Sequence, residues 1–483
     1  MLFNSLRFLL FFPAVFLLYW GLPQRFRKVL LLAASYYFYM CWKPEFIVLI
    51  LLSTIVDYAC GLGMERWPRG KRLLLAVSLT VNLGLLFFFK YFNFFGETLT
   101  AVCRAVSIPF SAPVMDIVLP VGISFYTFQT LSYTIDVYRG KLKPEHDFIL
   151  FALFVSYFPQ LVAGPIERAE NLMPQLKAAH TFRYDDAARG LRLMVWGFFK
   201  KCVAAAYLAK LVDPVFENVA ACSGGAVALA AAAFALQIYC DFGGYSDIAR
   251  GCSKMMGVDL MVNFKSPYFF SKSIGEYWKR NHISLTNWFH EYVYIPLGGG
   301  RRGFGRKLVN TWIVFFLSGL WHGANWTFVV WGLLQALYIS GEQVWRRLRG
   351  TAEHRHCNAC SKVFMICRTF ALSCFSLIFF RADTMADALC AARAAVTGLL
   401  HPRGYVLDAL TLLCAGGKWA ALITIFAVLL LFAVDWADER TDVMARIGQL
   451  HPAVRWPLYV VFLLGLLLLI PKTTAAPFIY FQF

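Results

Sequence analysis

A run of 32 almost uncharged residues, from Leu308 to Ile339, limits what this chain can fold into more than any other feature. As one helix the run would be about 48 Å long, whereas a single membrane crossing needs only about 20 residues. Gly323 lies near its middle, next to His322. The run therefore predicts two short helices that meet at or inside a bilayer, with His322 at their junction. An ionisable side chain at that depth is costly and by default indicates a functional site. The alternative is an interfacial histidine in a tight loop between two short spans.

The rest of the chain is also apolar. Of its 483 residues 59% are hydrophobic and 15% are charged, whereas soluble domains carry about 25% charged residues. This composition predicts an all-α polytopic membrane protein with about 11 to 13 transmembrane or re-entrant helices. Besides the pair around His322, the expected spans are Leu6–Leu22, Val29–Trp42, Phe46–Met64, Leu73–Phe95, Val114–Tyr133, Phe148–Pro165, Gly190–Leu211, Ala226–Phe242, Val363–Phe380, Ala420–Val434 and Leu458–Ile470.

The formal net charge of +18 is concentrated in short basic loops at Arg66–Arg72, Arg301–Lys307 and Arg346–Arg349. In a membrane chain such loops follow the positive-inside bias, so we place them in the cytoplasm. No nucleic-acid-binding motif accompanies them, and we expect no nucleic-acid partner. The segment Met1–Trp20 has no cleavage-site pattern before Pro23, and we expect it to be retained as the first span.

No shift in composition separates a soluble domain from the rest. We expect a single integral-membrane domain over residues 1–483. Within it we expect N-terminal helices at about 1–110, a catalytic core at about 114–345, and C-terminal helices with a tail at about 360–483.

The chain has 13 cysteines, most of them in apolar segments, where they suit small buried hydrophobic residues better than a disulfide framework. One cluster joins His354, His356, Cys357 and Cys360, residue types that bind zinc at such short spacing. A second pair of ligands at finger-like distance is missing, and Arg355 adds a repelling charge. We therefore expect no metal, although a zinc ion at this cluster remains the alternative.

The most polar long stretch, Asp241–Lys307, interleaves aromatic and polar side chains, a pattern typical of partly buried helices that line a cavity or lie at a membrane interface. Ser273 and Glu276 form a capping-box pattern that predicts a helix through His282. A further turn or helix is expected to start at Ser284. These residues are too polar to face lipid.

His282 and His322 are two of only nine histidines, and they are candidates for one proton-handling site. Spacing alone leaves open whether they meet. Around them the chain resembles the membrane-bound O-acyltransferase family, closest to the bacterial branch that O-acetylates alginate, other exopolysaccharides or peptidoglycan. The matching motifs occur in the same order from about Leu119 onward, at Leu119–Gln129, Phe158–Ile166, Asp241–Ala249, Asn281–Leu285, Tyr294–Gly299 and Trp321–Gly323.

The resemblance implies helices around a central funnel or tunnel, with His322 as the catalytic histidine and His282 as a supporting one. The chain departs from the family pattern at three motifs. Asn281 stands in place of the usual tryptophan, and Gly243 in place of a serine. His290 and Glu291 replace the usual arginine and aspartate, a change that points to an altered donor or partner contact.

The resemblance further implies acyl transfer from a thioester, with acetyl-CoA as donor substrate and no bound cofactor, to a hydroxyl group. A hydroxyl needs a base within hydrogen-bond reach, and neutral imidazole suits that task. We expect His322 to be the base, and His282, Asn325 or Asn281 to polarise the carbonyl. Asp241 and Asp247 either orient a histidine or cap a helix. Trp321 is also expected at the substrate site. The expected partners of the CoA phosphates are Lys279, Arg280, Arg301 and Arg302. The alternative for each of these cations is that its charge only sets the membrane topology.

The last residues, Pro477–Phe483, place Tyr480 among phenylalanines. The ending is similar to a Phe-x-Tyr-x-x-Phe sequence of this branch and of small partner proteins in D-alanylation systems, where the tyrosine is implicated as an acyl carrier. We hypothesise that Tyr480 carries the acyl group to an extracytoplasmic acetyltransferase partner. The alternative is an aromatic belt at the membrane interface.

The expected activity is acetyl transfer across the cytoplasmic membrane of a bacterium for O-acetylation of a cell-surface polysaccharide. Two alternatives stay open. One is D-alanyl transfer from a carrier protein to teichoic acid. The other is a non-catalytic transporter of acyl groups or lipid-linked sugars, which would predict paired intramembrane charges or duplicated broken helices.

Overall fold

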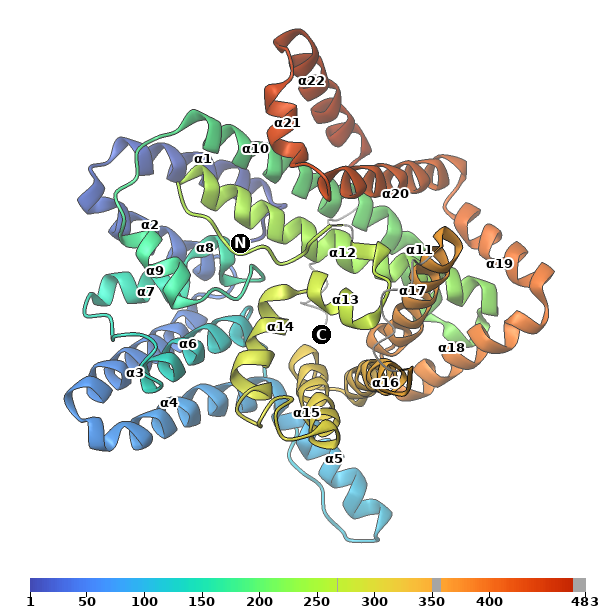
Figure 1. Ribbon diagram of the computed structural model, residues 1–483, viewed down its shortest axis with the longest axis horizontal. Helices are drawn as coiled ribbons and strands as arrows, with labels where there is room; N and C mark the ends of the chain where they lie inside the picture. The colour runs from blue at the N-terminus through green and yellow to red at the C-terminus, as the bar shows by residue number, and fades with distance from the viewer. Residues whose placement is uncertain (267, 350–357, 472–483) are drawn as a thin grey trace. The chain divides into compact units, whose positions relative to one another are not determined.

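The computed structural model describes residues 1–266, 268–349 and 358–471. These residues fold into helices joined by turns and loops, with no strand among them, which confirms the predicted all-α class. Two compact units are present (Figure 1): residues 1–191 with 248–261, and residues 192–247 with the described residues between 262 and 471. The helices α10 (Tyr184–Phe198) and α12 (Gly224–Met255) contribute residues to both units.

The first unit is built from the N-terminal helices. Its elements are α1 (Leu6–Gly21), α2 (Gln24–Met40), η1 (Pro44–Phe46), α3 (Ile47–Arg66), η2 (Pro68–Gly70), α4 (Lys71–Leu86), η3 (Phe87–Tyr91), α5 (Phe92–Ala105), α6 (Ile123–Tyr138), α7 (Phe148–Ser156), α8 (Phe158–Leu161) and α9 (Ala169–Lys177).

Residues 248–261 belong to this unit because buried polar side chains bind them to it. The Ser253 hydroxyl donates to the Tyr157 hydroxyl at 3.2 Å, and the Met261 amide donates to Glu167 at 2.5 Å. Glu167 is fully buried, and desolvation raises the pKa of its carboxyl to about 7. A buried carboxyl that gains hydrogen bonds in this way ties together segments that are distant in sequence.

The second unit holds the remaining elements. They are η4 (Phe199–Ala204), α11 (Ala205–Glu217), η5 (Val219–Ala221), η6 (Tyr268–Phe270), α13 (Ile274–Arg280), α14 (Ile283–Phe289), η7 (His290–Tyr294), α15 (Phe304–His322), α16 (Trp326–Arg349), α17 (Ala359–Arg381), α18 (Met385–Thr397), η8 (Gly398–Leu400), α19 (Pro402–Ala415), α20 (Lys418–Asp438), α21 (Val443–Gln449) and α22 (Pro452–Leu469). Its hydrophobic core is formed mainly by α11, α12, α17 and α18.

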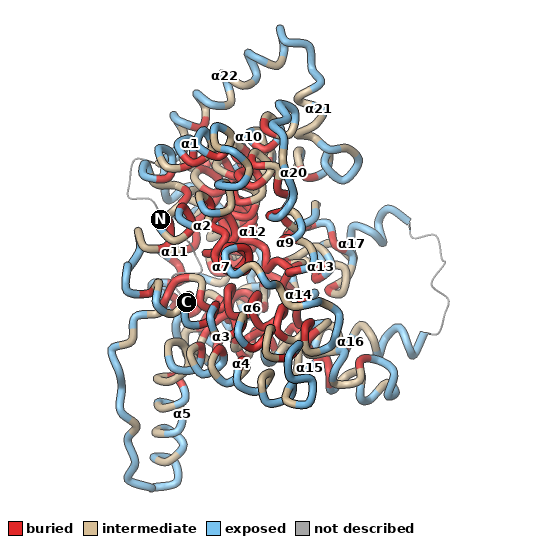
Figure 2. The backbone as a smooth tube through the Cα atoms, turned by 90° about the vertical axis from the view of Figure 1, so that its left-hand side faces the viewer, coloured by how far each residue is buried: buried red, intermediate tan, exposed pale blue. Residues whose placement is uncertain are grey.

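Six helices among the described residues are long and apolar enough to cross a membrane, and α1 and the α7–α8 segment are shorter apolar helices. The chain is therefore a multi-pass membrane protein. Burial differs sharply between the spanning helices (Figure 2): α12 is 67% buried over its most apolar window, whereas α22 is 6% buried. The larger number of crossings that we expect from the sequence includes shorter and re-entrant segments, and that number stays a prediction, as does the three-part division of the chain.

The expected span Val114–Tyr133 is wrong in its first half. Residues 106–122 are not helical, and α6 begins only at Ile123. Gly122 precedes the helix with a φ of +76°, and a Cβ atom there would lie 2.6 Å from the Leu161 carbonyl oxygen. This left-handed residue in close contact with another backbone breaks the helix, because only glycine fits there without strain.

Candidate active site

The long apolar run folds into two helices, as predicted. α15 ends at His322, three residues intervene, and α16 begins at Trp326. The two helices approach closely, since a Cβ atom at Gly332 of α16 would lie 2.2 Å from the Phe315 carbonyl oxygen of α15. Glycine at this contact lets the backbones meet, which sets the position of the last turn of α15 and of His322 within it.

His322 is 5% exposed and is surrounded by aromatic side chains. Its ring centroid lies 5.0 Å from that of Trp331 and 5.3 Å from that of Phe380, both with edge-to-face geometry. Trp321 stacks edge-on at 5.0 Å. An imidazole held among large rigid rings has few alternative rotamers, so its orientation is set by packing.

His282 is held in a different way. The predicted helix, α13, is present but ends two residues before His282, at Arg280, and the expected second helix, α14, begins at Ile283, one residue before Ser284. His282 stands between them with a φ of +44°, one of two non-glycine residues in the described chain with a positive φ. A bulky side chain in this region costs about 1–3 kcal/mol and persists only where the surroundings enforce it.

The expected start of α13 is confirmed. The Ser273 hydroxyl accepts a hydrogen bond from the Glu276 amide at 3.0 Å. The second half of the capping box differs, because the Glu276 carboxylate accepts from the Lys272 amide and not from that of Ser273. From α16, Glu342 accepts hydrogen bonds from the amides of Ile274 at 2.7 Å and Gly275 at 3.2 Å. α16 therefore supports α13 as well as α15.

Asn263 enforces the break at His282. Its backbone carbonyl accepts from the Ile283 amide at 2.9 Å. Its side-chain oxygen accepts from the Ser284 amide at 3.2 Å and from the Ser284 hydroxyl at 2.9 Å, and it lies 3.2 Å from Nδ1 of His282. Asn263 and His282 are 0% and 3% exposed. A buried residue whose backbone carbonyl and side-chain oxygen together contact three consecutive residues holds the strained conformation in place.

The structure brings the two histidines together. Their ring centroids are 6.2 Å apart, and Trp321 also contacts His282 at 5.8 Å. Phe242 of α12 packs edge-on against His282 at 4.7 Å. Burial lowers the pKa of His282 to about 3, because the low-dielectric surroundings penalise the imidazolium form. His282 is therefore neutral at physiological pH.

The two aspartates of α12 pair with lysines of the π-helical turn η4: Asp241 with Lys201, and Asp247 with Lys200. Both aspartates lie inside α12, so the capping alternative is wrong. Both lysines are buried, and pairing compensates the cost of their desolvation.

The glycines of the same motif explain one departure from the family pattern. A Cβ atom at Gly244 would lie 2.7 Å from the Gly197 carbonyl oxygen, so this glycine is required for the close approach of α12. At Gly243 the nearest atom to an added Cβ is Nζ of Lys200, at 3.5 Å, an ordinary van der Waals distance. Glycine and a small side chain are therefore both compatible with position 243.

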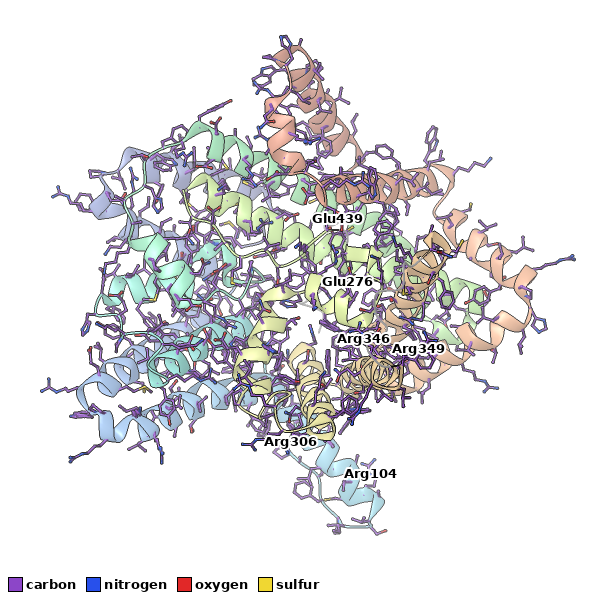
Figure 3. All side chains as sticks on the ribbon, in the orientation of Figure 1. Arg104, Glu276, Arg306, Arg346, Arg349 and Glu439 are labelled. Carbon is purple, nitrogen blue, oxygen red and sulfur yellow. The ribbon has the colours of Figure 1, made fainter. Side chains whose placement is uncertain are left out.

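The predicted phosphate partners differ in availability. Lys279 is exposed. Arg280 forms ion pairs with Glu276 at 3.1 Å and with Glu439 at 3.4 Å, the two carboxylates labelled in Figure 3. An arginine held by two carboxylates is less available to a phosphate than a lysine that projects into solvent.

The two candidate asparagines both lie at helix ends. The Asn325 amide donates to the Asp383 carbonyl oxygen at 2.9 Å and accepts from the Thr327 amide at 3.1 Å. Asn281 ends α13, where its backbone amide donates to the Tyr277 carbonyl oxygen. Asn281 therefore lies next to His282 at the end of α13, and Asn325 lies three residues after His322, just before α16.

Tyr480 lies outside the described residues, as do His354, His356 and Cys357. Within the described ranges no group of three or more histidine, cysteine, aspartate or glutamate side chains has the arrangement of a metal site. The expectations for the tail and for this cluster stay predictions.

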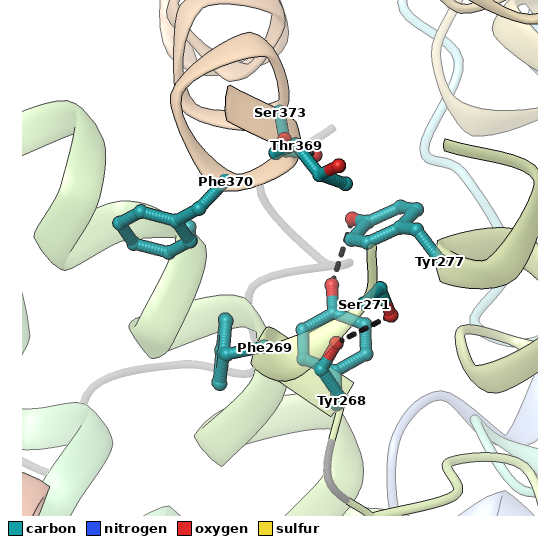
Figure 4. Close-up of a pocket in the computed structure, with 8 residues that line it drawn as sticks. Tyr268, Phe269, Ser271, Tyr277, Thr369, Phe370 and Ser373 are labelled. Carbon is teal, nitrogen blue, oxygen red and sulfur yellow. Dashed lines mark hydrogen bonds between the residues drawn. The ribbon is translucent and has the colours of Figure 1, made fainter. Parts of the chain in front are cut away.

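A small cavity of about 10 Å³ lies next to α13, lined by Tyr268, Tyr277 and Phe370 among others (Figure 4). The Tyr268 hydroxyl donates to that of Tyr277 at 2.7 Å. This volume accepts about one water molecule, so the cavity does not accommodate an acyl donor.

The fold and the two adjoining buried histidines define a multi-pass membrane protein with a buried two-histidine site. Residues 142–381 match the membrane-bound O-acyltransferase family. The probable alginate O-acetylase of Pseudomonas putida is 39% identical over 392 residues, covering 80% of this chain and 78% of the relative. The peptidoglycan O-acetyltransferase of Helicobacter pylori is 32% identical, covering 80% and 78%. The teichoic acid D-alanyltransferase of Lacticaseibacillus rhamnosus is 25% identical, covering 65% and 82%. The chain belongs to the membrane-bound O-acyltransferase family and is an acyltransferase.

Sequence reasoning misses Asn263, Trp331 and Phe380. Trp331 follows His322 by nine residues within the same apolar run. Because that run was expected to form two helices that meet at His322, a contact between the two residues could have been predicted. Phe380 and Asn263 come from other segments, and no local pattern links either residue to a histidine.

Proposed function

We propose that this protein passes an acetyl group from cytoplasmic acetyl-CoA across the membrane for O-acetylation of a cell-surface polysaccharide. The observation that carries the proposal is the convergence of His282 and His322 in a buried site of an O-acyltransferase. Relatives named for alginate and peptidoglycan O-acetylation support acetyl as the acyl group and a polysaccharide as the final acceptor.

The chemistry assigns His322 as the general base. The accepting hydroxyl oxygen bonds to the thioester carbonyl carbon while its proton passes to the imidazole. The carbon–sulfur bond then breaks, and the departing sulfur takes the proton back. No net proton is gained or lost. Among the proposed partners for the CoA phosphates, Lys279, Arg301 and Arg302 are exposed, whereas Arg280 is held in ion pairs.

The location and the partner follow from this proposal. A donor in the cytoplasm and an acceptor outside the cell place the protein in the cytoplasmic membrane of a bacterium, with an extracytoplasmic acetyltransferase as partner. Tyr480 is the proposed acyl carrier between the two. Replacing Tyr480 by phenylalanine removes the only reactive oxygen of that side chain, so polymer acetylation in cells should be lost. Full acetylation in this variant would exclude the carrier role.

The deciding experiment measures the O-acetyl content of surface polymers in a deletion strain that carries wild type or His322→Ala at matched membrane levels. We expect wild type alone to restore acetylation, which would also identify the polymer. Equal restoration by both would leave a conduit, with the chemistry done by another protein.

The similarity to D-alanyltransferases supports one further candidate, transfer of D-alanine from a carrier protein. Binding of acetyl-CoA to the purified protein, compared with binding of a D-alanyl carrier protein, separates the two donors.

A further inference from the structure

The hydrogen bonds of Asn263 determine which end of its side-chain amide faces His282. The Ser284 backbone amide can only donate, so the atom that it contacts at 3.2 Å must be the amide oxygen. The orientation leaves the Asn263 side-chain nitrogen buried without a partner among the described residues. A buried donor without a partner costs about 1–3 kcal/mol. The hydrogen bonds that the Asn263 side-chain oxygen accepts therefore outweigh this cost and fix the orientation of the amide.

The amide orientation in turn determines the tautomer of His282. Nδ1 of His282 lies 3.2 Å from the Asn263 oxygen, which has only lone pairs to offer. If Nδ1 lacked a proton, two lone pairs would face each other inside a buried site. Nδ1 must therefore carry the hydrogen. Because the neutral ring has one N–H, the lone pair is on Nε2.

We propose that Asn263 is a positioning residue that holds His282 in its Nδ1-protonated tautomer, so that His282 serves acyl transfer as a hydrogen-bond acceptor through Nε2. Under this proposal His282 does not polarise the thioester carbonyl, since polarisation requires a donor; Asn325 or Asn281 would take that role. The proposal rests on the proposed acyltransferase function of the two-histidine site.

The low basicity of His282 is consistent with an accepting role. A general base works best when its pKa is near the working pH, and burial lowers the pKa of His282 to about 3. His282 therefore remains neutral while His322 takes the proton of the hydroxyl.

The distance between the two imidazole rings shows whether they can form a direct hydrogen bond. Each ring nitrogen lies roughly 1.3 Å or less from its own centroid, so centroids 6.2 Å apart exclude a direct N–H···N hydrogen bond. One oxygen, that of a water molecule, spans such a gap. A water molecule at that position would accept the N–H of His322 and donate to Nε2 of His282, and the other nitrogen of His322 would stay available to the hydroxyl. The proton leaves the hydroxyl for His322 as the carbon–oxygen bond forms, and passes to the sulfur as the carbon–sulfur bond breaks.

The first test observes the tautomer directly by nitrogen NMR of the full-length protein labelled in its histidines. The His282 signals are assigned by their loss in His282→Ala. We expect a proton on Nδ1 and none on Nε2. A proton on Nε2 would overturn the proposal. Because this measurement involves no acyl transfer, its outcome is independent of the proposed function.

The second test is a double-mutant cycle on acyl transfer. Asn263→Leu keeps the branched heavy-atom shape but removes the acceptor, and we expect activity to fall about 10- to 100-fold, as when an orienting partner of a functional histidine is lost. In the His282→Ala background, the same substitution should cost nothing further. Additive losses would show that Asn263 supports the fold without acting through His282.

Two further variants sharpen the cycle. Asn310→Leu removes another fully buried amide of the same unit, and its effect should add to that of His282→Ala. Asn263→Asp keeps the acceptor and places a negative charge beside the ring, which raises the pKa of His282. Activity should persist near neutral pH, with the acid side of the pH profile moved to higher pH. A profile that does not move would contradict a contact between position 263 and His282 during catalysis.

Discussion

His322 and His282 lie in the same buried site, but they are positioned by different structural features. His322 ends a regular helix, and its position follows from the close packing of α15 on α16. His282 occupies a strained residue between two short helices, and its position depends on hydrogen bonds from Asn263. Packing sets where an imidazole lies, whereas the hydrogen bonds also set which nitrogen carries the proton. The difference suits the proposed roles, in which His322 exchanges a proton and His282 does not.

α16 contacts both the helix that carries His322 and the helix that precedes His282. Gly332 brings it against α15, while Glu342 holds the start of α13. A third contact, from the Trp278 indole to Gln335 at 3.1 Å, lies between them along the helix. The distance between the histidines is therefore set largely by one rigid element.

The largest expected effect comes from the ion pair that supports α12, the helix whose Phe242 packs on His282. Lys201→Met leaves Asp241 as a buried charge without this cation, and should lower the free energy of unfolding by about 3–5 kcal/mol. Adding Asp241→Leu should recover most of the loss. Thermal unfolding of the purified protein in detergent measures both. Equal losses in the single and double variants would show that the pair is not the source of the effect.

Gly332→Ala tests the packing that positions His322. The added Cβ meets the Phe315 carbonyl oxygen, so the helices must separate, at a cost of about 1–3 kcal/mol and with a loss of acyl transfer. Gly341→Ala is the matched control on the same helix, because nothing lies within 4 Å of its Cβ. It should be neutral or slightly stabilising. Similar melting temperatures for the two variants would argue against close packing as the determinant.

The neutral state of His282 predicts a pH dependence of stability. The folded-state pKa of about 3 is below the ordinary value of 6.5, so the unfolded chain binds more protons between these values. This contribution to stability is complete above about pH 6.5 and is lost as the pH falls, by up to about 1.4 kcal/mol per pH unit. Melting curves of wild type and His282→Gln between pH 7 and 5 should converge on acidification. Parallel curves would contradict burial of a neutral histidine.

The smallest effect concerns the strained backbone. His282→Gly and His282→Ala both delete the ring, but alanine keeps a Cβ at a φ of +44°. Glycine should therefore be the more stable variant, by about 1 kcal/mol. Differential scanning measurements in one detergent compare the two. Higher stability of the alanine variant would mean that the segment relaxes out of the left-handed region.

Sequence patterns predicted the all-α membrane fold, the helix break at His322 and the cap at Ser273, because each depends on neighbours within a few residues. They failed at Gly122, where a contact with Leu161 stops the expected span, and at His282, which was expected to be the last helical residue but lies outside both helices. In both places a distant segment outweighs local helical preference.

Sequence by itself determined the membrane environment of this protein, the two candidate histidines and the family that carries them, since hydrophobicity and motifs are properties of the linear chain. Only the tertiary structure decided that the histidines meet, that Asp241 and Asp247 pair with lysines, and that Asn263 orients His282. Each of these contacts joins residues on different segments, and the direction of a hydrogen bond depends on where packing places its donor and acceptor.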